Sequence, residues 1–138
     1  MIRNCDFQEK LKLRLQHFEK NLINKNKIKL IFELDYRLEL KEFNIALQYN
    51  VLTDYQAAIK SFENFLIDFP GSDLREKAMY YRFDSAYKLA INSVIWRQKE
   101  RIENAVSYFN SFKNSYNDSE LMDEMESKLS ELSEINNI

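Results

Sequence analysis

The only proline and the only glycine of this 138-residue chain stand side by side, as Pro70 and Gly71. Because tight turns between strands draw on these two residue types, their scarcity argues for helices joined by short connections. Proline disfavours helical geometry in the residue before it, so a preceding helix is expected to end at Phe69. Gly71 is expected to let the chain reverse, and Ser72 to cap the next helix. The stretch 55–74 therefore predicts a helix, a tight turn and a second helix.

Apolar residues recur at helical spacing along the whole chain. The clearest stripe comprises Ala58, Ile59, Phe62, Phe65, Leu66 and Phe69. Similar stripes, separated by polar breaks that include 24–26, predict helices over 6–23, 27–50, 55–69, 72–91, 98–116 and 119–134. Asp6 is expected to cap the first of them, and Thr53 or Asp54 to cap the third. The predicted fold is all-α, with about six helices.

The stretch 55–74 recurs 47 residues later, at 102–121. The aligned pairs are Ala58 and Ala105, Phe62 and Phe109, Phe65 and Phe112, Ser72 and Ser119, and Leu74 and Leu121. The same offset towards the N-terminus reaches only a stripe of large apolar residues, which are Leu11, Leu15, Phe18 and Leu22. Repeating units of this kind cannot bury their apolar faces alone, so we expect them to stack into a solenoid.

The repeated unit resembles the tetratricopeptide repeat. Residues 54–70 carry its second-helix pattern, D-Y-x-x-A-I-x-x-F-x-x-F-L-x-x-x-P, and Ala46 and Tyr49 stand where its first helix has a small and an aromatic residue. The next unit departs from the pattern, with Asn117 in place of the proline. The resemblance implies tetratricopeptide-like helical hairpins in a short superhelix. It divides a single domain, 1–138, into a degenerate unit at 6–36, clear units at 37–71 and 72–118, and a capping helix at 119–134.

A narrower resemblance covers residues 37–117. D-F-P-G-S at 68–72, followed by L-R-E-x-A at 74–78, looks like a turn and helix entry of the BamD family, in its Bacteroidetes-type members. These tetratricopeptide-repeat lipoproteins belong to the outer-membrane β-barrel assembly machinery. The resemblance is to their C-terminal half, and it implies a non-catalytic scaffold without a cofactor at the periplasmic face of the outer membrane. The implied protein partners are a BamA-like barrel protein and unfolded client barrels.

The N-terminal segment departs from that family. BamD proteins carry a lipid-attachment cysteine behind a signal peptide, whereas Cys5 follows Met-Ile-Arg-Asn, which is neither a signal peptide nor a lipobox. This departure is expected of a C-terminal fragment, of a truncated gene product or of a different adaptor, and a cytoplasmic tetratricopeptide-repeat adaptor is the alternative function. No run of 18 apolar residues predicts a membrane span.

Residues able to carry catalysis or bind a metal form no recognised motif. A chain with one glycine has neither a G-x-S-x-G nucleophile turn nor a glycine-rich phosphate loop. His17 has no Cys or His partner at ligand spacing. Asp123, Glu124 and Glu126 are interpreted as a solvated helix face. We therefore expect no catalytic, cofactor-binding or metal-binding residue, and no enzyme activity.

A basic strip at 10–29 holds seven Lys or Arg residues against Glu19 alone. Such a strip is usually a solvated face, but it can also dock an acidic protein or a phosphate backbone. A nucleic-acid-binding helical protein is therefore a second alternative. The net charge of −2 gives no overall field that would attract nucleic acid.

Partner contacts are expected beside the repeat motif. Tyr80, Tyr81, Phe83 and Tyr87 exceed what one buried face needs. Some of them are expected to line a concave groove and the rest to pack in the core, and Tyr80, Phe83 and Tyr87 are taken as contact candidates. Trp96 and Arg97 are of the residue types enriched in binding hot spots, although Trp96 can instead cover the end of the helical stack. The remaining candidates lie on the helix before the turn: Lys60, Ser61 and Asn64. Ser61 aligns with a partner-binding arginine of the BamD family, so that particular contact is not carried over to this chain.

Overall fold

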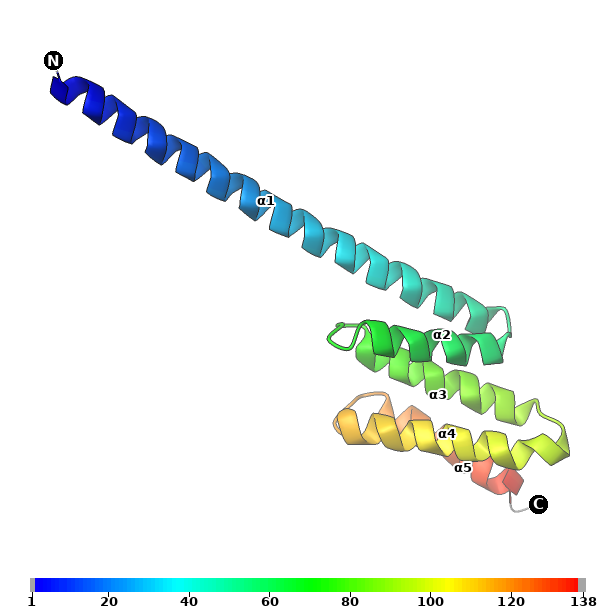
Figure 1. The fold of residues 1–138 in the computed structure, drawn as a ribbon. Helices are drawn as coiled ribbons and strands as arrows, with labels where there is room; N and C mark the ends of the chain where they lie inside the picture. The colour runs from blue at the N-terminus through cyan, green and yellow to red at the C-terminus, as the bar shows by residue number, and fades with distance from the viewer. Residues whose placement is uncertain (1, 137–138) are drawn as a thin grey trace. The chain divides into compact units, whose positions relative to one another are not determined.

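The computed structural model describes residues 2–136 and the side chains of residues 6–136, so the side chain of Cys5 lies outside it. Over this range the chain forms five α-helices, which are α1 (Ile2–Val51), α2 (Tyr55–Asp68), α3 (Arg75–Ile91), α4 (Ile95–Ser115) and α5 (Met122–Asn136) (Figure 1). The predicted all-α fold is confirmed, with five helices in place of about six. None of these helices is both long enough and apolar enough to cross a membrane.

The helix break expected at 24–26 is wrong, because α1 continues through it. Asn24 and Asn26 are weak helix formers, but the lysines between and after them are good ones, and no glycine or proline interrupts the run. The N-cap expected at Asp6 is also wrong, since Asp6 lies inside α1. Its carboxylate instead lies 3.6 Å from the Nζ of Lys10 one turn later, as an exposed ion pair.

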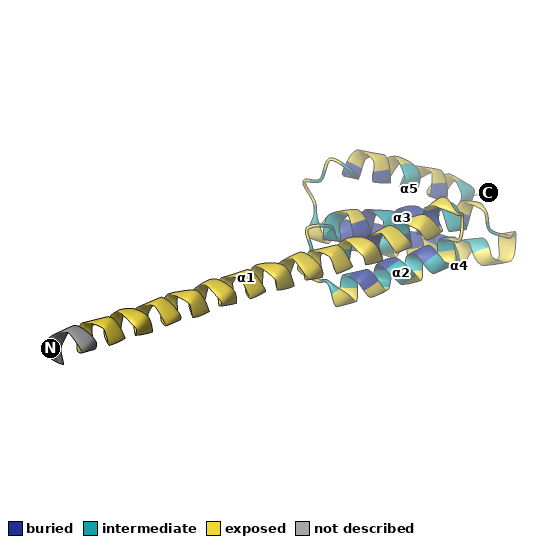
Figure 2. Cartoon of the chain, turned by 90° about the horizontal axis from the view of Figure 1, so that it is seen from above, coloured by how far each residue is buried: buried dark blue, intermediate teal, exposed yellow. Residues whose placement is uncertain are grey.

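The chain divides into two compact units, Met1–Leu38 and Glu39–Ile138. The first unit is the N-terminal part of α1, and every side chain from 6 to 38 is exposed (Figure 2). The exposed side chains include large apolar ones, with Phe18 at 63% and Phe32 at 70% of full exposure. A single helix has no neighbour within its own unit, so these side chains have nothing there to pack against.

The second unit packs the end of α1, residues 39–51, with the four following helices. In it α3 packs against both α2 and α4, and α5 packs against α3 and α4 (Figure 1). The Phe43 ring makes T-shaped contacts with the rings of Phe62 and Phe65, each at 5.8 Å between centroids. The same core cluster contains three fully buried alanines, which let the helices approach closely: Ala46, Ala58 and Ala78. A second cluster includes Met79, Phe83, Phe109, Phe112, Met125 and Leu132.

The two turns related by the 47-residue offset have the same backbone geometry. Phe69 ends α2 at φ −127° and ψ 62°, and Tyr116 ends α4 at φ −136° and ψ 55°. Each donates its N–H to the carbonyl oxygen four residues back. In each turn a serine hydroxyl, of Ser72 or Ser119, accepts a hydrogen bond at 3.1 Å from the backbone N–H two residues later. The same hydroxyls donate to glutamates of α1 and α3, so each serine ties its turn to an earlier helix.

Two expectations about these turns need correction. Ser72 is not the N-cap of α3, because the cap is Leu74 and the hydroxyl bonds to the cap residue itself. Gly71 is not required for the reversal, since its φ is not positive and a Cβ added there would have no atom within 4 Å. The cap of α2 is confirmed, with Asp54 Oδ1 accepting from the Ala57 N–H at 3.2 Å.

Candidate protein-binding surfaces

A polar network joins α1, α3 and α5 around the carboxylate of Asp84, which is only 3% exposed. One carboxylate oxygen lies 2.9 Å from the Nζ of Lys128, and the other lies 2.9 Å from the Nζ of Lys88. Asn50, from the end of α1, donates to the same carboxylate at 3.3 Å and to the Ser85 hydroxyl at 2.7 Å. Burial acts to raise the pKa of Asp84, but the hydrogen bonds from the two lysines outweigh it and lower the pKa. Asp84 therefore remains ionised inside the helical stack.

Lys128 is the second centre of this network. Its Nζ donates to Glu124 and to the Tyr80 hydroxyl, both at 2.9 Å, and lies 5.2 Å from the centre of the Tyr80 ring and 5.7 Å from that of Tyr87. Burial acts to lower the pKa of Lys128, but bonds with Tyr80, Asp84 and Glu124 raise it. Burial and the bond to Glu124 raise the pKa of Tyr80 to about 12. Because both lysines already bind Asp84, the network holds helices together and offers no free cation to a ligand.

A smaller polar contact joins α2, α3 and α4. The Tyr108 hydroxyl donates to Glu63 at 2.7 Å, and the guanidinium of Arg82 lies 4.4 Å from the centre of the Tyr108 ring. Burial, together with the bond to Glu63, raises the pKa of Tyr108 to about 12. A cation held over an aromatic face in a partly dry site adds on the order of 1 kcal/mol. The second unit is thus held by polar contacts outside its apolar core as well as by the core.

The predicted groove residues separate into two kinds. Tyr80 and Tyr87 come together beside Lys128, and the Tyr87 hydroxyl donates to Glu131 of α5. Phe83 is fully buried and contacts the Phe109 ring at 6.0 Å between centroids, so it belongs to the aromatic residues that pack in the core and is not a groove contact. An aromatic stripe alone does not reveal which side of a helix meets solvent when that helix has neighbours on several sides.

The other predicted contact residues lie elsewhere. Lys60 and Asn64 are exposed on α2, and Ser61 beside them is half-buried. Trp96 and Arg97 are exposed in the first turn of α4, because that helix begins at Ile95. The eight candidates therefore do not form one site.

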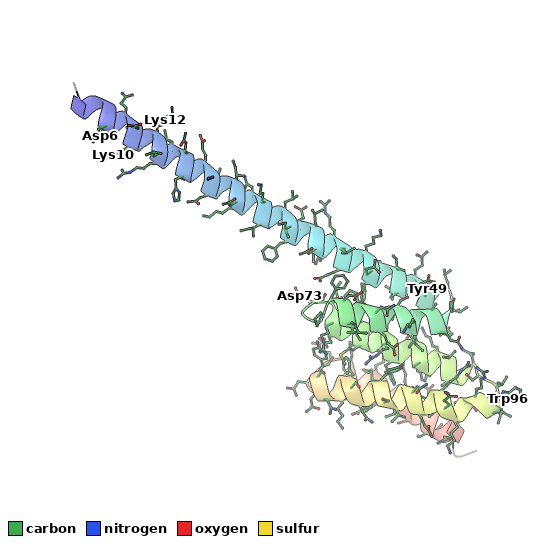
Figure 3. The ribbon with its side chains drawn as sticks, in the orientation of Figure 1. Asp6, Lys10, Lys12, Tyr49, Asp73 and Trp96 are labelled. Atoms are coloured by element: carbon green, nitrogen blue, oxygen red, sulfur yellow. The ribbon has the colours of Figure 1, made fainter. Side chains whose placement is uncertain are left out.

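Four apolar residues at the α3–α4 turn form an exposed surface that we call the apolar edge: Ile91, Val94, Ile95 and Trp96. Ile95 is 87% exposed and Trp96 is 81% exposed, and Figure 3 shows Trp96 at the tip of this turn. An indole this exposed does not cover the end of the stack, so that interpretation of Trp96 is wrong. The sequence signal that was missed is Val94-Ile95-Trp96, three apolar residues in a row directly after a polar break.

Hydrogen bonds hold the turn that carries the apolar edge. The Ser93 hydroxyl donates to the Leu89 carbonyl oxygen and accepts from Arg101, while the Gln98 amide donates to the Ala90 carbonyl oxygen at 3.4 Å. A pocket of about 370 Å³ opens beside the edge, with a lining that includes Ile95, Lys99, Ile102 and Ile135. Exposed aromatic and aliphatic residues next to a pocket are the usual make-up of a protein-docking site.

Comparison with known protein families identifies the family to which the chain belongs. Residues 11–136 match the YfiO family, which is described as an outer membrane lipoprotein. The chain belongs to the YfiO family. The match covers α1 from residue 11 onwards and the whole of α2 to α5, and the resemblance to outer-membrane assembly lipoproteins is confirmed at the level of this family. A search of curated proteins finds no match.

Proposed function

We propose that this chain is a non-catalytic, protein-binding scaffold that acts as a BamD-like subunit, of the Bacteroidetes type, in the assembly of outer-membrane β-barrel proteins. Its place is the periplasmic face of the outer membrane, and its partners are a BamA-like barrel protein and unfolded client barrels. Membership of the YfiO family supports the process and the location. The stacked helices of the second unit support a scaffold, since such arrays present extended binding surfaces.

The apolar edge is the observation that supports a docking site on this chain. Ile95 and Trp96 are adjacent and almost fully exposed, although large apolar side chains gain free energy when they leave water. Hydrogen bonds on both sides of the turn already order the backbone that presents them. A preordered surface loses little conformational entropy when it binds, so more of the contact energy appears as affinity. The edge is therefore proposed to contact a domain of the barrel protein.

Site-specific photo-crosslinking in cells tests this function. Trp96 is replaced by benzoyl-phenylalanine in one variant and Ile67 in another, since Ile67 is 75% exposed on α2 and lies outside the edge. We expect the probe at position 96 to capture a barrel-assembly protein in the envelope fraction and the probe at position 67 to capture much less of it. Capture of only cytosolic proteins at position 96 would contradict the proposal and favour a cytoplasmic adaptor.

The exposed basic strip 10–29 supports nucleic-acid binding as a second candidate function. Binding of this kind depends steeply on salt, because each phosphate contact releases counterions. A gel-shift measurement with mixed-sequence duplex at about 50 mM salt distinguishes it from the scaffold. Absence of a shift at that salt concentration removes this candidate.

A further inference from the structure

The N-terminal part of α1 carries a regular apolar seam that has no neighbour within its unit. Spacings of four and three residues alternate along it, as in the a and d positions of a heptad repeat. The seam comprises Leu11, Leu15, Phe18, Leu22, Lys25, Lys29, Phe32 and Tyr36, all exposed. It spans about 39 Å at about 1.5 Å per residue. A seam of this length and period is the surface by which one helix supercoils with another.

We propose that the seam pairs with the same seam of a second copy of this chain, in an antiparallel coiled coil whose two-fold axis passes between residues 23 and 24. In antiparallel pairs each a position meets a d position of the other helix. Leu11 then faces Tyr36 of the second copy, and Leu15 faces Phe32. The two-fold axis repeats both layers, which gives apolar contacts at each end of the seam.

Charges beside the seam favour the same alignment. Lys12 comes opposite Glu33 of the second copy, and Arg14 comes opposite Asp35, so symmetry forms each ion pair twice. Glu33 already accepts a hydrogen bond from Arg37 of its own helix at 2.7 Å, and a carboxylate has further acceptor sites for Lys12. Positions flanking a coiled-coil seam commonly set partner choice and orientation in this way.

The two lysines within the seam also fit this register. Lys29 faces Phe18 of the second copy, over whose ring an ammonium group is attracted, and Lys25 faces Leu22. Their aliphatic stems can cover these side chains while the charged ends reach solvent. The lysines weaken the dimer, but a polar residue at such a position also specifies the register.

Three neighbouring alignments of the seam oppose like charges. A shift of one heptad in one direction places Glu19 opposite Glu19 of the second copy. The opposite shift places Glu19 against Glu33 and Lys25 against Lys29. A parallel, in-register pair places each seam lysine against its own copy. Of these four alignments, the antiparallel pairing about residues 23 and 24 is the one that avoids these contacts, and it combines apolar layers at both ends with opposite charges beside them.

Sedimentation equilibrium of the purified 138-residue chain tests the proposal, over about 1–100 μM protein at about 0.1 M salt. We expect a species of twice the 16.6 kDa chain mass. Leu15→Glu places a charge in the seam and should raise the dimer dissociation constant by about tenfold or more. Leu13→Glu is the matched control, because Leu13 is 61% exposed and Leu15 is 60% exposed, but Leu13 lies away from the seam. The control should leave the dissociation constant within about twofold of that of the unchanged chain.

Charge reversal tests the register independently. Lys12→Glu and Glu33→Lys should each weaken the dimer by about threefold or more, and the double variant should restore most of the loss. Circular dichroism at the same concentrations shows whether each variant retains its helices. A monomer up to about 100 μM, equal effects of the two leucine variants, or failure of the double variant to restore affinity overturns the proposal. Association that disappears after nuclease treatment overturns it as well and favours nucleic acid as the occupant of the strip.

Discussion

The turn at 69–74 and the turn at 116–121 have the same geometry but different residues. One contains Pro70 and Gly71, and the other has Asn117 and Asp118 in their places. Both keep a serine that bonds to the backbone two residues later and to a glutamate of an earlier helix. The comparison teaches that the apolar stripe before the turn and the serine after it determine the reversal. The proline and glycine are one of two ways to connect them.

The largest effect on stability is expected when the aromatic side chain before each turn is truncated, which tests whether the two turns are equivalent. Phe65 and Phe112 are related by the offset of 47, and both are almost fully buried. We expect Phe65→Ala and Phe112→Ala each to lower the free energy of unfolding by about 3–5 kcal/mol, since each leaves a cavity in a core cluster. Urea unfolding followed by circular dichroism gives both values. A difference of more than about 2 kcal/mol would show that the two hairpins are not equivalent.

The next test concerns a pair of positions that are related by the offset of 47 but differ in burial. Asp84 is buried between two lysines, whereas its counterpart at the same offset, Glu131, is exposed. We expect Asp84→Ala to lower the free energy of unfolding by about 3 kcal/mol at neutral pH, because Lys128 loses a buried partner. Glu131→Ala should cost less than about 0.5 kcal/mol. Chemical denaturation of the two variants measures both.

The contribution of Asp84 also has a predicted pH dependence. Its pKa is lowered in the folded chain, so the unfolded chain binds the proton more readily. The stabilisation is then present above the unfolded pKa, which is about 3.9, and is lost as the pH falls through the folded value. The difference between the unchanged chain and Asp84→Ala should therefore shrink below about pH 4. A difference that stays constant down to about pH 2 contradicts the assignment.

Removal of the serine hydroxyls should have a smaller effect. Ser72→Ala and Ser119→Ala each delete one bond to the backbone and one to a glutamate of an earlier helix. We expect a loss of about 1 kcal/mol for each, as for other side-chain bonds that order a turn or helix end. The loss should be similar at the two sites, and thermal unfolding of the matched pair measures it. A loss at Ser72 alone would mean that the second turn is held in another way.

The smallest expected effect is at the glycine. Gly71 has no positive φ and no neighbour within 4 Å of an added Cβ, so Gly71→Ala should stabilise the chain by about 0.5 kcal/mol through the unfolded state. Asp118→Ala at the equivalent position is the control and should change stability little. A clear destabilisation by Gly71→Ala would show that the first turn needs the freedom of glycine.

The sequence predicted those helices whose apolar periodicity and end signals lie in neighbouring residues. The apolar stripes located α2 to α5 to within a few residues. The offset of 47 aligned the two turns, whose backbone geometry the structure shows to match. The break at 24–26 failed because weak helix formers do not end a helix when nothing else competes for the backbone. Ser72 failed as a cap because its hydroxyl bonds to Leu74 and to a helix distant in sequence.

The candidate site was less predictable than the fold. Phe83 and Tyr87 lie one turn apart on α3, yet Phe83 is buried and Tyr87 reaches Glu131, and only the neighbouring helices decide between these two outcomes. The contacts of Asp84 with Asn50 and Lys128 join residues 34 and 44 positions apart, a distance at which no local pattern operates, and only its pair with Lys88 follows helical spacing. Trp96 could be chosen from its residue type, whereas its exposure depends on where α4 begins.

The placement of Trp96 also determines what fluorescence can report. It is the only tryptophan of the chain, and in the folded state its indole is already surrounded by solvent. Its emission should therefore change little when the stack unfolds, in contrast to a buried indole that moves into water. A protein that covers the apolar edge would remove this water and shift the emission to shorter wavelength. The chain thus carries a built-in optical probe of docking that is nearly silent to its own unfolding.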